Sequence, residues 1–345
     1  MLDDLTLIHQ RDSEDLLGIA AKQWQQLLHK FDFEGNKQFG NVYNVVYAGM
    51  GGSALAALFV NVWPRLKEPF EVSREYELPP YVDGDTLVIV SSYSGNTEET
   101  LSALADAETR GAQIAVIAGG GKLEEIALAK GYLFAKIPKA PQPRYAVFYN
   151  LRALLDILVI AGVLNHDQFD VELEQTADFL QQTAGAWRAD IPTAQNAAKQ
   201  LAQEIVGKSV VVYSGPRMHP AAYKWKISFN ENAKHVAWLG ELPEFNHNEF
   251  IGWSKQPTDK PYAVIDLRSN LEHERVQKRF EVSARLLSGL RPEPHVVQAQ
   301  GDTLLEQLLW LITFGDFVTL YLAILNGVNP APVDLVEKFK KELAL

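Results

Sequence analysis

Two turns in the first half of the chain combine glycines and hydroxyls in a pattern that could bind an anion. The first, Gly49-Met50-Gly51-Gly52-Ser53-Ala54, follows a β-branched run and opens an apolar helical pattern. Glycines let backbone N–H groups approach an anion, and the N-terminus of a helix favours negative charge. The string also fits the dinucleotide pattern G-x-G-x-x-A, with Glu71 at the spacing of an acidic ribose partner. This turn alone therefore leaves open a phosphate site, a nicotinamide site and a tight turn without a ligand.

The second turn is rich in hydroxyl side chains. It reads Ser92-Tyr93-Ser94-Gly95-Asn96-Thr97-Glu98-Glu99-Thr100 and again stands between a predicted strand and a predicted helix. We expect Asn96 to cap this helix, with Glu99 in the capping-box position, but that leaves Ser92 and Ser94 unexplained. Ligands of a doubly wound sheet bind beyond the carboxyl ends of its strands, so both turns can converge on one small anion. A dinucleotide has no use for the hydroxyl cluster, which therefore favours a sugar phosphate.

The two strings G-G-S and S-x-S-G-N-T resemble the sugar isomerase (SIS) domain, a phosphosugar-binding α/β fold. The resemblance implies that hydroxyl side chains hold the phosphate, next to the backbone of two glycines. These substrate-binding residues are Ser53, Ser92, Ser94 and Thr97, with Gly51 and Gly52. The first turn lacks the Lys-Ser/Thr ending of a nucleotide-triphosphate loop, so it does not indicate an ATPase.

Two polar stretches stand between apolar elements in the second half of the chain. They are Phe229-Asn230-Glu231-Asn232-Ala233-Lys234 and Glu241-Leu242-Pro243-Glu244-Phe245-Asn246-His247-Asn248. Glu231 lies at the end of a predicted helix, and an ordinary glutamate is ionised at neutral pH and can act as a base. Taken alone, a single glutamate such as Glu231 is more often a solvated surface charge than a catalytic base. His247 is one of eight histidines, and by itself it could also be a surface residue.

Together with Pro143-Arg144 and Lys340, these stretches resemble the bifunctional phosphoglucose/phosphomannose isomerases of the SIS superfamily. The strings that carry the resemblance are F-N-E-N-A-K, E-L-P-E-x-x-H-N and a terminal G-V-N-P followed by Lys340. The resemblance extends from about Val42 to the C-terminus. It is far more specific than the glycine turn.

The resemblance implies a role for each of these side chains. Glu231 is the base that moves a proton between C1 and C2 of the sugar, His247 assists ring opening and Arg144 steadies the enediolate. Lys340 is implied as a partner in ring opening and closure, although Lys338 and Lys341 flank it. The family further implies a homodimer in which the histidine is supplied across the subunit interface, so that the active site lies at that interface.

The implied chemistry needs no metal. Aldose–ketose interconversion needs a proton moved between adjacent carbons, a positive charge near the developing oxyanion and acid/base help at the ring oxygen. The eight histidines show neither H-x-H nor H-x-x-x-H spacing. We therefore expect no metal and no cofactor, unlike a zinc-dependent mannose-phosphate isomerase.

The sequence thus predicts an isomerase that interconverts glucose 6-phosphate and fructose 6-phosphate through a cis-enediol, with mannose 6-phosphate as a further candidate substrate. Val333 stands seven residues before Lys340, where these isomerases usually carry a threonine that gives room for either C2 epimer. The alternative function is a non-catalytic sugar-phosphate sensor, since SIS domains also act as ligand-binding modules. A nicotinamide dehydrogenase stays open on the glycine turn alone, whereas a glutamine-dependent aminosugar synthase would need a cysteine.

The composition of the chain excludes some classes of binding partner. The chain has 345 residues and a net charge of −11, which gives no positive field for nucleic acid or an anionic membrane. It has no cysteine, and it begins without a secretory signal pattern, so a cytoplasmic location is expected. The run Leu308 to Val328 is nearly apolar over the length of a membrane span, but Asp316 at its middle predicts a buried helix of a soluble domain.

Short β-branched runs alternate with longer amphipathic stretches, which is the pattern of βαβ units. We expect an α/β fold of two SIS-type doubly wound subdomains, each a parallel sheet flanked by helices. The predicted strands are 42–48, 70–73, 86–91, 113–118 and 132–137 in the first half, and 209–213, 263–266 and 295–298 in the second. The predicted helices are 53–62, 97–110, 123–130, 145–163, 219–230, 272–288 and 304–325. One domain should cover residues 1–164, including N-terminal helices, and the other residues 165–345, including a linker helix and a terminal helix.

Overall fold

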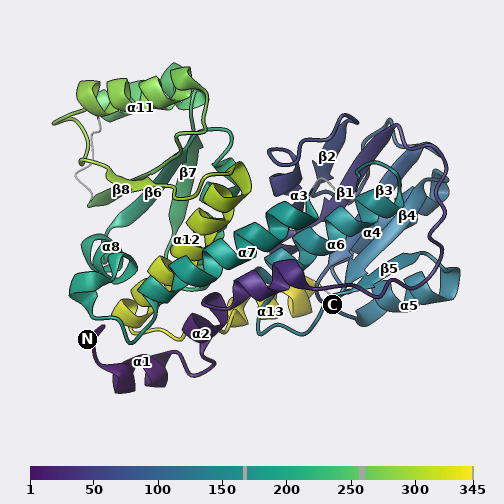
Figure 1. The fold of residues 1–345 in the computed structure, drawn as a ribbon, viewed down its shortest axis with the longest axis horizontal. Coiled ribbons are helices and arrows are strands. Elements are labelled where there is room, and N and C mark those ends of the chain that lie inside the picture. The colour runs from purple at the N-terminus through teal and green to yellow at the C-terminus, as the bar shows by residue number, and fades with distance from the viewer. Residues whose placement is uncertain (166–168, 256–260, 344–345) are drawn as a thin grey trace. The chain divides into compact units, whose positions relative to one another are not determined.

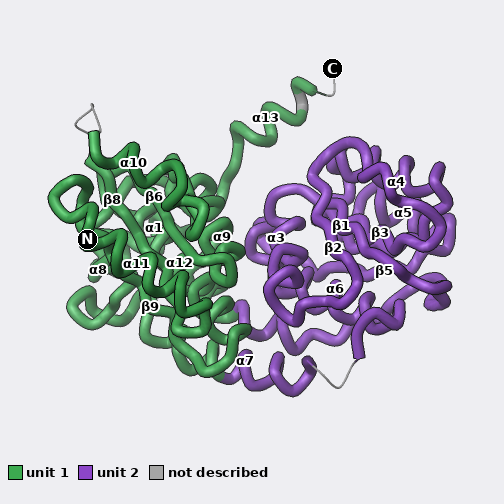
Figure 2. The backbone as a smooth tube through the Cα atoms, turned by 90° about the horizontal axis from the view of Figure 1, so that it is seen from above, with its two compact units in different colours: residues 1–22, 179–345 green, residues 23–178 purple. Residues whose placement is uncertain are grey.

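The computed structural model of the chain describes all residues except 166–168, 256–260 and 344–345. Among the described residues it contains two separate sheets, both parallel, as the alternating pattern predicts (Figure 1). Residues 23–178 form unit 2, which holds the first sheet, and residues 1–22 with 179–345 form unit 1, which holds the second (Figure 2). The predicted α/β class with two parallel sheets is confirmed.

Unit 2 is a doubly wound sheet with helices on both faces. Its strands are β1 (Asn44–Gly49), β2 (Phe70–Ser73), β3 (Thr86–Ser92), β4 (Gln113–Ala118) and β5 (Leu133–Lys136), in the order β2-β1-β3-β4-β5. Its helices are α3 (Gly51–Val60), α4 (Glu98–Thr109), α5 (Gly121–Lys130) and α6 (Val147–Ile160), with the 3-10 turns η1 (Gln23–Leu28) and η2 (Pro143–Tyr145). All seven residues of β3 are buried, because the strand is central and covered on both faces.

Unit 1 repeats the design with a four-stranded sheet. Its strands are β6 (Ser209–Ser214), β7 (Ala237–Glu241), β8 (Tyr262–Arg268) and β9 (His295–Gln298), in the order β7-β6-β8-β9. Its helices are α1 (Leu5–Arg11), α2 (Leu16–Ala20), α8 (Ala197–Ile205), α9 (His219–Glu231), α10 (Glu249–Gly252), α11 (Glu274–Leu286), α12 (Leu304–Asn326) and α13 (Asp334–Leu343). Its 3-10 turns are η4 (Gly185–Trp187), η5 (Thr193–Gln195), η6 (Glu244–His247) and η7 (Trp253–Lys255). Helix α7 (Asp170–Ala184) begins in unit 2 and ends in unit 1.

Helix α12 is the apolar run that raised the question of a membrane span. Within the described part of the chain it is the one helix with the required length and hydropathy, and 94% of its most apolar stretch is buried inside the structure. Thr303 and Glu306 form a capping box at its start, and Gly327 ends it in a left-handed conformation with φ 72°. The predicted buried helix is confirmed: Asp316 is fully buried and forms an ion pair with Lys224 of α9.

The structure departs from the sequence analysis in two elements. Strand β7 was missed, because its residues Ala-Trp-Leu-Gly-Glu show little β-branched character and follow the polar F-N-E-N-A-K stretch. Residues 1–22 join unit 1, where α2 packs on α12, rather than the first sheet as we expected. The units therefore differ from the expected division after residue 164. Residues 166–168 of the predicted linker and 344–345 of the predicted terminal helix lie outside the described residues.

Candidate active site

The two glycine and hydroxyl turns lie side by side at the carboxyl edge of the first sheet. Strands β1 and β3 are neighbours, and their register places Gly49 opposite Ser91, so the turns that follow both strands begin at the same level. They are also in direct contact, since the backbone N–H of Tyr93 donates to Ser53 Oγ at 3.1 Å. The predicted convergence of the two turns is therefore seen in the structure.

Three hydroxyls of the second turn form a compact cluster. Ser92 Oγ lies 2.7 Å from Thr97 Oγ1 and 3.4 Å from Ser94 Oγ. Ser92 is buried and Ser94 is exposed, so the cluster extends from the core to the surface of the sheet edge. Hydroxyls both donate and accept, so they can turn their donors toward a phosphate. The arrangement suits a small anion with several oxygens.

The expected cap at Asn96 is wrong. Helix α4 starts one residue later, with Thr97 at the N-cap, and the side chain of Asn96 instead accepts from the N–H of Lys122 on α5. Within the described residues, neither Thr97 of α4 nor Met50 of α3 caps its helix with a side chain. Both helices thus present first-turn N–H groups at the same sheet edge, where an anion is stabilised.

Arg144 reaches the same edge from the segment that follows β5. It is the central residue of η2, and only 1% of it is exposed. A Cβ atom placed on Gly52 would lie 3.2 Å from the backbone nitrogen of Arg144, so the glycine turn and η2 are packed backbone to backbone. The Arg144 guanidinium carbon lies 5.3 Å from the ring centroid of Tyr145. Unit 2 therefore brings seven of the predicted site residues to one edge: Gly51, Gly52, Ser53, Ser92, Ser94, Thr97 and Arg144.

Glu231 is the last residue of α9, at the amino edge of the second sheet. Lys234 Nζ donates to the backbone oxygen of Glu231 at 2.6 Å and to that of Pro330 at 3.2 Å. Asn326 Nδ2 donates to the backbone oxygen of Ala233 at 3.1 Å. The G-V-N-P segment therefore lies beside Glu231, although the two are about a hundred residues apart in the sequence.

His247 lies at the opposite edge of the same sheet. Helix α9 runs antiparallel to the strands, so Glu231 comes before β7, whereas His247 ends η6, which follows the carboxyl end of β7. Strand β7 has 5 residues, and at about 3.3 Å per residue the two edges are about 16 Å apart. The side chain of His247 is exposed. The structure does not bring Glu231 and His247 of one chain together.

A second histidine, His219, lies at the same edge of the second sheet as His247. His219 begins α9, and its Nδ1 lies 2.7 Å from Oε2 of Glu241, the last residue of β7. This contact joins the start of α9 to the end of β7 at that edge of the sheet. No local sequence pattern marks this pair, because its members are 22 positions apart and the parallel pairing of β6 with β7 joins them.

Lys340 lies on α13, where its Nζ is 2.8 Å from Glu337 Oε1. Both side chains are more than half exposed, as in an ordinary surface ion pair. Lys338 is also exposed, and the side chain of Lys341 lies outside the described residues. The choice of lysine for ring opening stays a prediction.

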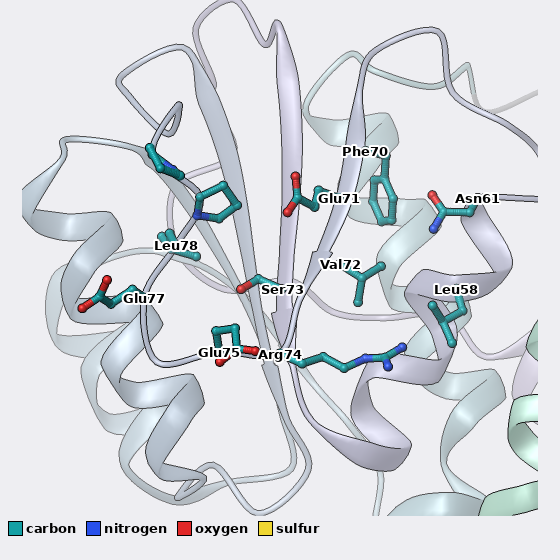
Figure 3. Close-up of a pocket in the computed structure, with 12 residues that line it drawn as sticks. Leu58, Asn61, Phe70, Glu71, Val72, Ser73, Arg74, Glu75, Glu77 and Leu78 are labelled. Carbon is teal, nitrogen blue, oxygen red and sulfur yellow. The ribbon is translucent and has the colours of Figure 1, made fainter. Parts of the chain in front are cut away.

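A pocket elsewhere in unit 2 bears on the dinucleotide alternative. It follows the open edge of β2 and has a volume of about 680 Å³ (Figure 3). Glu71 faces it, but the carboxylate accepts from Tyr81 at 2.7 Å, and Glu71 lies two residues before the carboxyl end of β2. None of the predicted site residues lines this pocket.

Across residues 1–165, 169–255 and 261–343, no group of three or more His, Asp or Glu side chains could hold a metal ion.

Comparisons with known proteins agree with the motifs. The family model "Bacterial phospho-glucose isomerase C-terminal SIS domain" matches residues 194–343. The bifunctional phosphoglucose/phosphomannose isomerase of Caldicellulosiruptor bescii is 35% identical over 318 residues, which cover 90% of this chain and 92% of the relative. The enzyme of the same name from Aquifex aeolicus is 35% identical over 302 residues, or 87% and 90% of the two chains.

A solved structure shows the same fold. The glucose-6-phosphate isomerase like protein from Thermus thermophilus superimposes with a TM-score of 0.64 at 20% identity, and the match covers 99% of this chain and 98% of the other. The two chains therefore share their fold. With relatives 35% identical over almost their whole length, the chain belongs to the bifunctional phosphoglucose/phosphomannose isomerase family of the SIS superfamily.

Proposed function

We propose that this protein is an aldose–ketose isomerase that interconverts glucose 6-phosphate and fructose 6-phosphate, and that it also accepts mannose 6-phosphate. The observation that carries the proposal is the hydroxyl cluster Ser92–Ser94–Thr97, which lies at the same sheet edge as the buried Arg144. It offers neutral donors for a phosphate and one fixed positive charge for a developing oxyanion. The family relationship supplies the reaction.

In the proposed mechanism the carboxylate of Glu231 takes the proton from C2 of open-chain glucose 6-phosphate. The enediolate that forms is stabilised by Arg144, and the proton is returned to C1 while the hydroxyl proton moves from O2 to O1. The product is fructose 6-phosphate, and the substrate as a whole is neither oxidised nor reduced. His247 and Lys340 assist the opening and closing of the sugar ring. Return of the proton to the other face of C2 yields mannose 6-phosphate.

We further propose a homodimer as the working form. Support comes from the second sheet, where Glu231 and His247 of one chain lie at opposite edges. If both act on one sugar, His247 must be supplied by a second copy, and a two-fold dimer does this symmetrically. A cytoplasmic location is part of the same proposal, supported by the absence of cysteine.

The first test is turnover of the purified, EDTA-treated protein on fructose 6-phosphate, with glucose 6-phosphate and mannose 6-phosphate quantified separately. Formation of both products is the expected result. Tight binding of fructose 6-phosphate without any product would favour the non-catalytic sensor. A requirement for added nicotinamide cofactor would favour the dehydrogenase.

A further inference from the structure

Helix α9 carries a buried polar stripe that faces α12. Lys224, Ser228 and Asn232 are spaced four residues apart, so they lie on one face of the helix, and each is completely buried. Ser228 Oγ donates to Asp316 Oδ1 at 2.8 Å, and Lys224 Nζ forms an ion pair with the same oxygen. Lys224 Nζ also lies 2.8 Å from Ser228 Oγ. Lys224, Ser228 and Asp316 thus form one connected cluster.

The stripe continues to the C-terminal end of α9. Asn232 Nδ2 donates to Thr319 Oγ1 of α12 at 3.0 Å. Near the other end, Trp225 Nε1 donates to the backbone oxygen of Leu311 at 2.7 Å. Trp225 fits only because α12 has Gly315 there, where a Cβ atom would lie 2.3 Å from Trp225 Nε1. The two helices are therefore fixed to each other at successive points along their contact.

Stability alone does not require this buried polar cluster. Helix α12 is otherwise almost wholly apolar, and a buried ion pair can often be replaced by apolar side chains without loss of stability. Apolar contacts are not directional, so they would let α9 rotate or slide on α12. Each directional hydrogen bond of the stripe is made in one register only, since a slip of one residue turns the helix by about 100° and moves it by about 1.5 Å.

The hydrogen bonds that set the register of α9 also flank Glu231. It is three residues after Ser228 and directly before Asn232, so the last two contacts of the stripe bracket it. A general base must lie within hydrogen-bond distance of the proton that it takes. An error of about 1 Å in its position can lower the rate about 10²-fold.

We propose that Asp316 is a positioning residue, which holds α9 in register through Lys224 and Ser228 and thereby places the carboxylate of Glu231 for proton transfer. The inference rests on the proposed function, in which Glu231 is the base. It concerns no contact between Asp316 and the substrate.

The test is a triple variant, Lys224→Met with Ser228→Ala and Asp316→Leu, which replaces the cluster by apolar side chains. We expect it to fold with an unchanged or raised Tm and to bind fructose 6-phosphate with a near-normal KM. Its kcat should fall at least ~10-fold, because a displaced base slows proton transfer. The primary deuterium isotope effect with C2-deuterated glucose 6-phosphate should rise, since proton transfer then limits the rate more fully. A purely structural role would lower Tm and leave the isotope effect unchanged.

Thr313→Val is the matched control. It removes another buried hydroxyl from α12, but among the described residues this hydroxyl bonds to Leu309 of its own helix, so kcat should not change. If the triple variant does not fold, Asp316→Asn, which keeps the shape of the side chain, gives the same readouts. Wild-type kcat and isotope effect in a folded variant would overturn the positioning role. Inactive wild-type protein would instead overturn the proposed function, and an active Glu231→Gln variant the role of Glu231.

Discussion

Glu231 and His247 lie at opposite edges of the second parallel sheet, separated by the length of β7. Both were predicted from one pair of neighbouring motifs, only sixteen positions apart. Because a strand stands between them, proximity in the sequence does not make them neighbours in one chain. This relationship gives the proposed dimer a direct test.

Mixing two inactive variants should restore activity. Glu231→Gln should lower kcat by the ~10² to 10⁴ typical of a lost general base, and His247→Ala should also impair turnover. In a dimer that shares residues across its interface, a mixed pair regains one site with both wild-type side chains. Random exchange of subunits should therefore give about a quarter of the wild-type activity. The measurement is fructose 6-phosphate turnover after the two proteins are unfolded and refolded together.

The control for this experiment is a mixture of Glu231→Gln with Glu231→Ala, which cannot form an intact site in any pairing. It should stay inactive. If the Glu231→Gln and His247→Ala mixture also stays inactive while subunit exchange is demonstrated, the two side chains act within one chain.

The hydroxyl cluster should control KM. Hydrogen bonds to a charged group contribute about 1.5–3 kcal/mol each, so Ser94→Ala combined with Thr97→Ala should raise KM at least ~10-fold. The kcat should change much less, because the phosphate is held equally in the ground state and the transition state. Steady-state kinetics on fructose 6-phosphate and competition by inorganic phosphate measure this. Thr109→Ala removes a hydroxyl from the far end of α4 and serves as the control; an unchanged KM in the double variant would place the phosphate elsewhere.

Val333 should influence the ratio of the two epimers. Its backbone oxygen accepts from the N–H groups of Val336 and Glu337, so it stands at the start of α13. A threonine there could use its hydroxyl to cap the helix, which contributes about 1 kcal/mol, and it restores the side chain usual in the family. We expect Val333→Thr to raise the yield of mannose 6-phosphate relative to glucose 6-phosphate. A product ratio that stays the same would show that this position does not select the epimer.

Glu272 should make stability depend on pH. It is only 6% exposed and accepts from the N–H groups of Arg217 and Met218, and burial raises the pKa of its carboxyl. A raised folded-state pKa means that the folded protein binds more protons than the unfolded chain, so stability falls as pH rises through that window. Glu272→Gln keeps an acceptor oxygen without a charge. It should therefore gain stability over the wild type as pH increases from the ordinary glutamate pKa to the raised value.

Urea unfolding at a series of pH values measures this effect. Glu281→Gln is the contrasting variant, because hydrogen bonding to Lys278 lowers the pKa of Glu281 and should give a small effect of opposite sign. An equal stability difference for Glu272→Gln at every pH would show that Glu272 does not titrate differently in the folded state.

The sequence alone determined much of the fold and of the phosphate site. Strands of a parallel sheet are continuous β-branched runs, so β1, β3 and β6 could be recognised locally. The turns after β1 and β3 converge because carboxyl ends of parallel strands share one edge. Strand β7 and the cap at Asn96 were not predicted correctly. The residues of β7 have a weak local propensity for β-structure, so the strand could not be recognised. The side chain of Asn96 accepts a hydrogen bond from Lys122, which is distant in the sequence, instead of capping the helix.

Only the tertiary structure decided how the catalytic candidates are placed. Amphipathic patterns give α2 an apolar face but not its partner, and residues 1–22 pack with the second sheet. The contact of Gly52 with Arg144 and the stripe from Lys224 to Asp316 join segments about ninety positions apart, which no local pattern encodes. The missed strand β7 also hid the separation of the two candidates: α9 runs against the strands and β7 returns across the sheet, so Glu231 and His247 come to opposite edges.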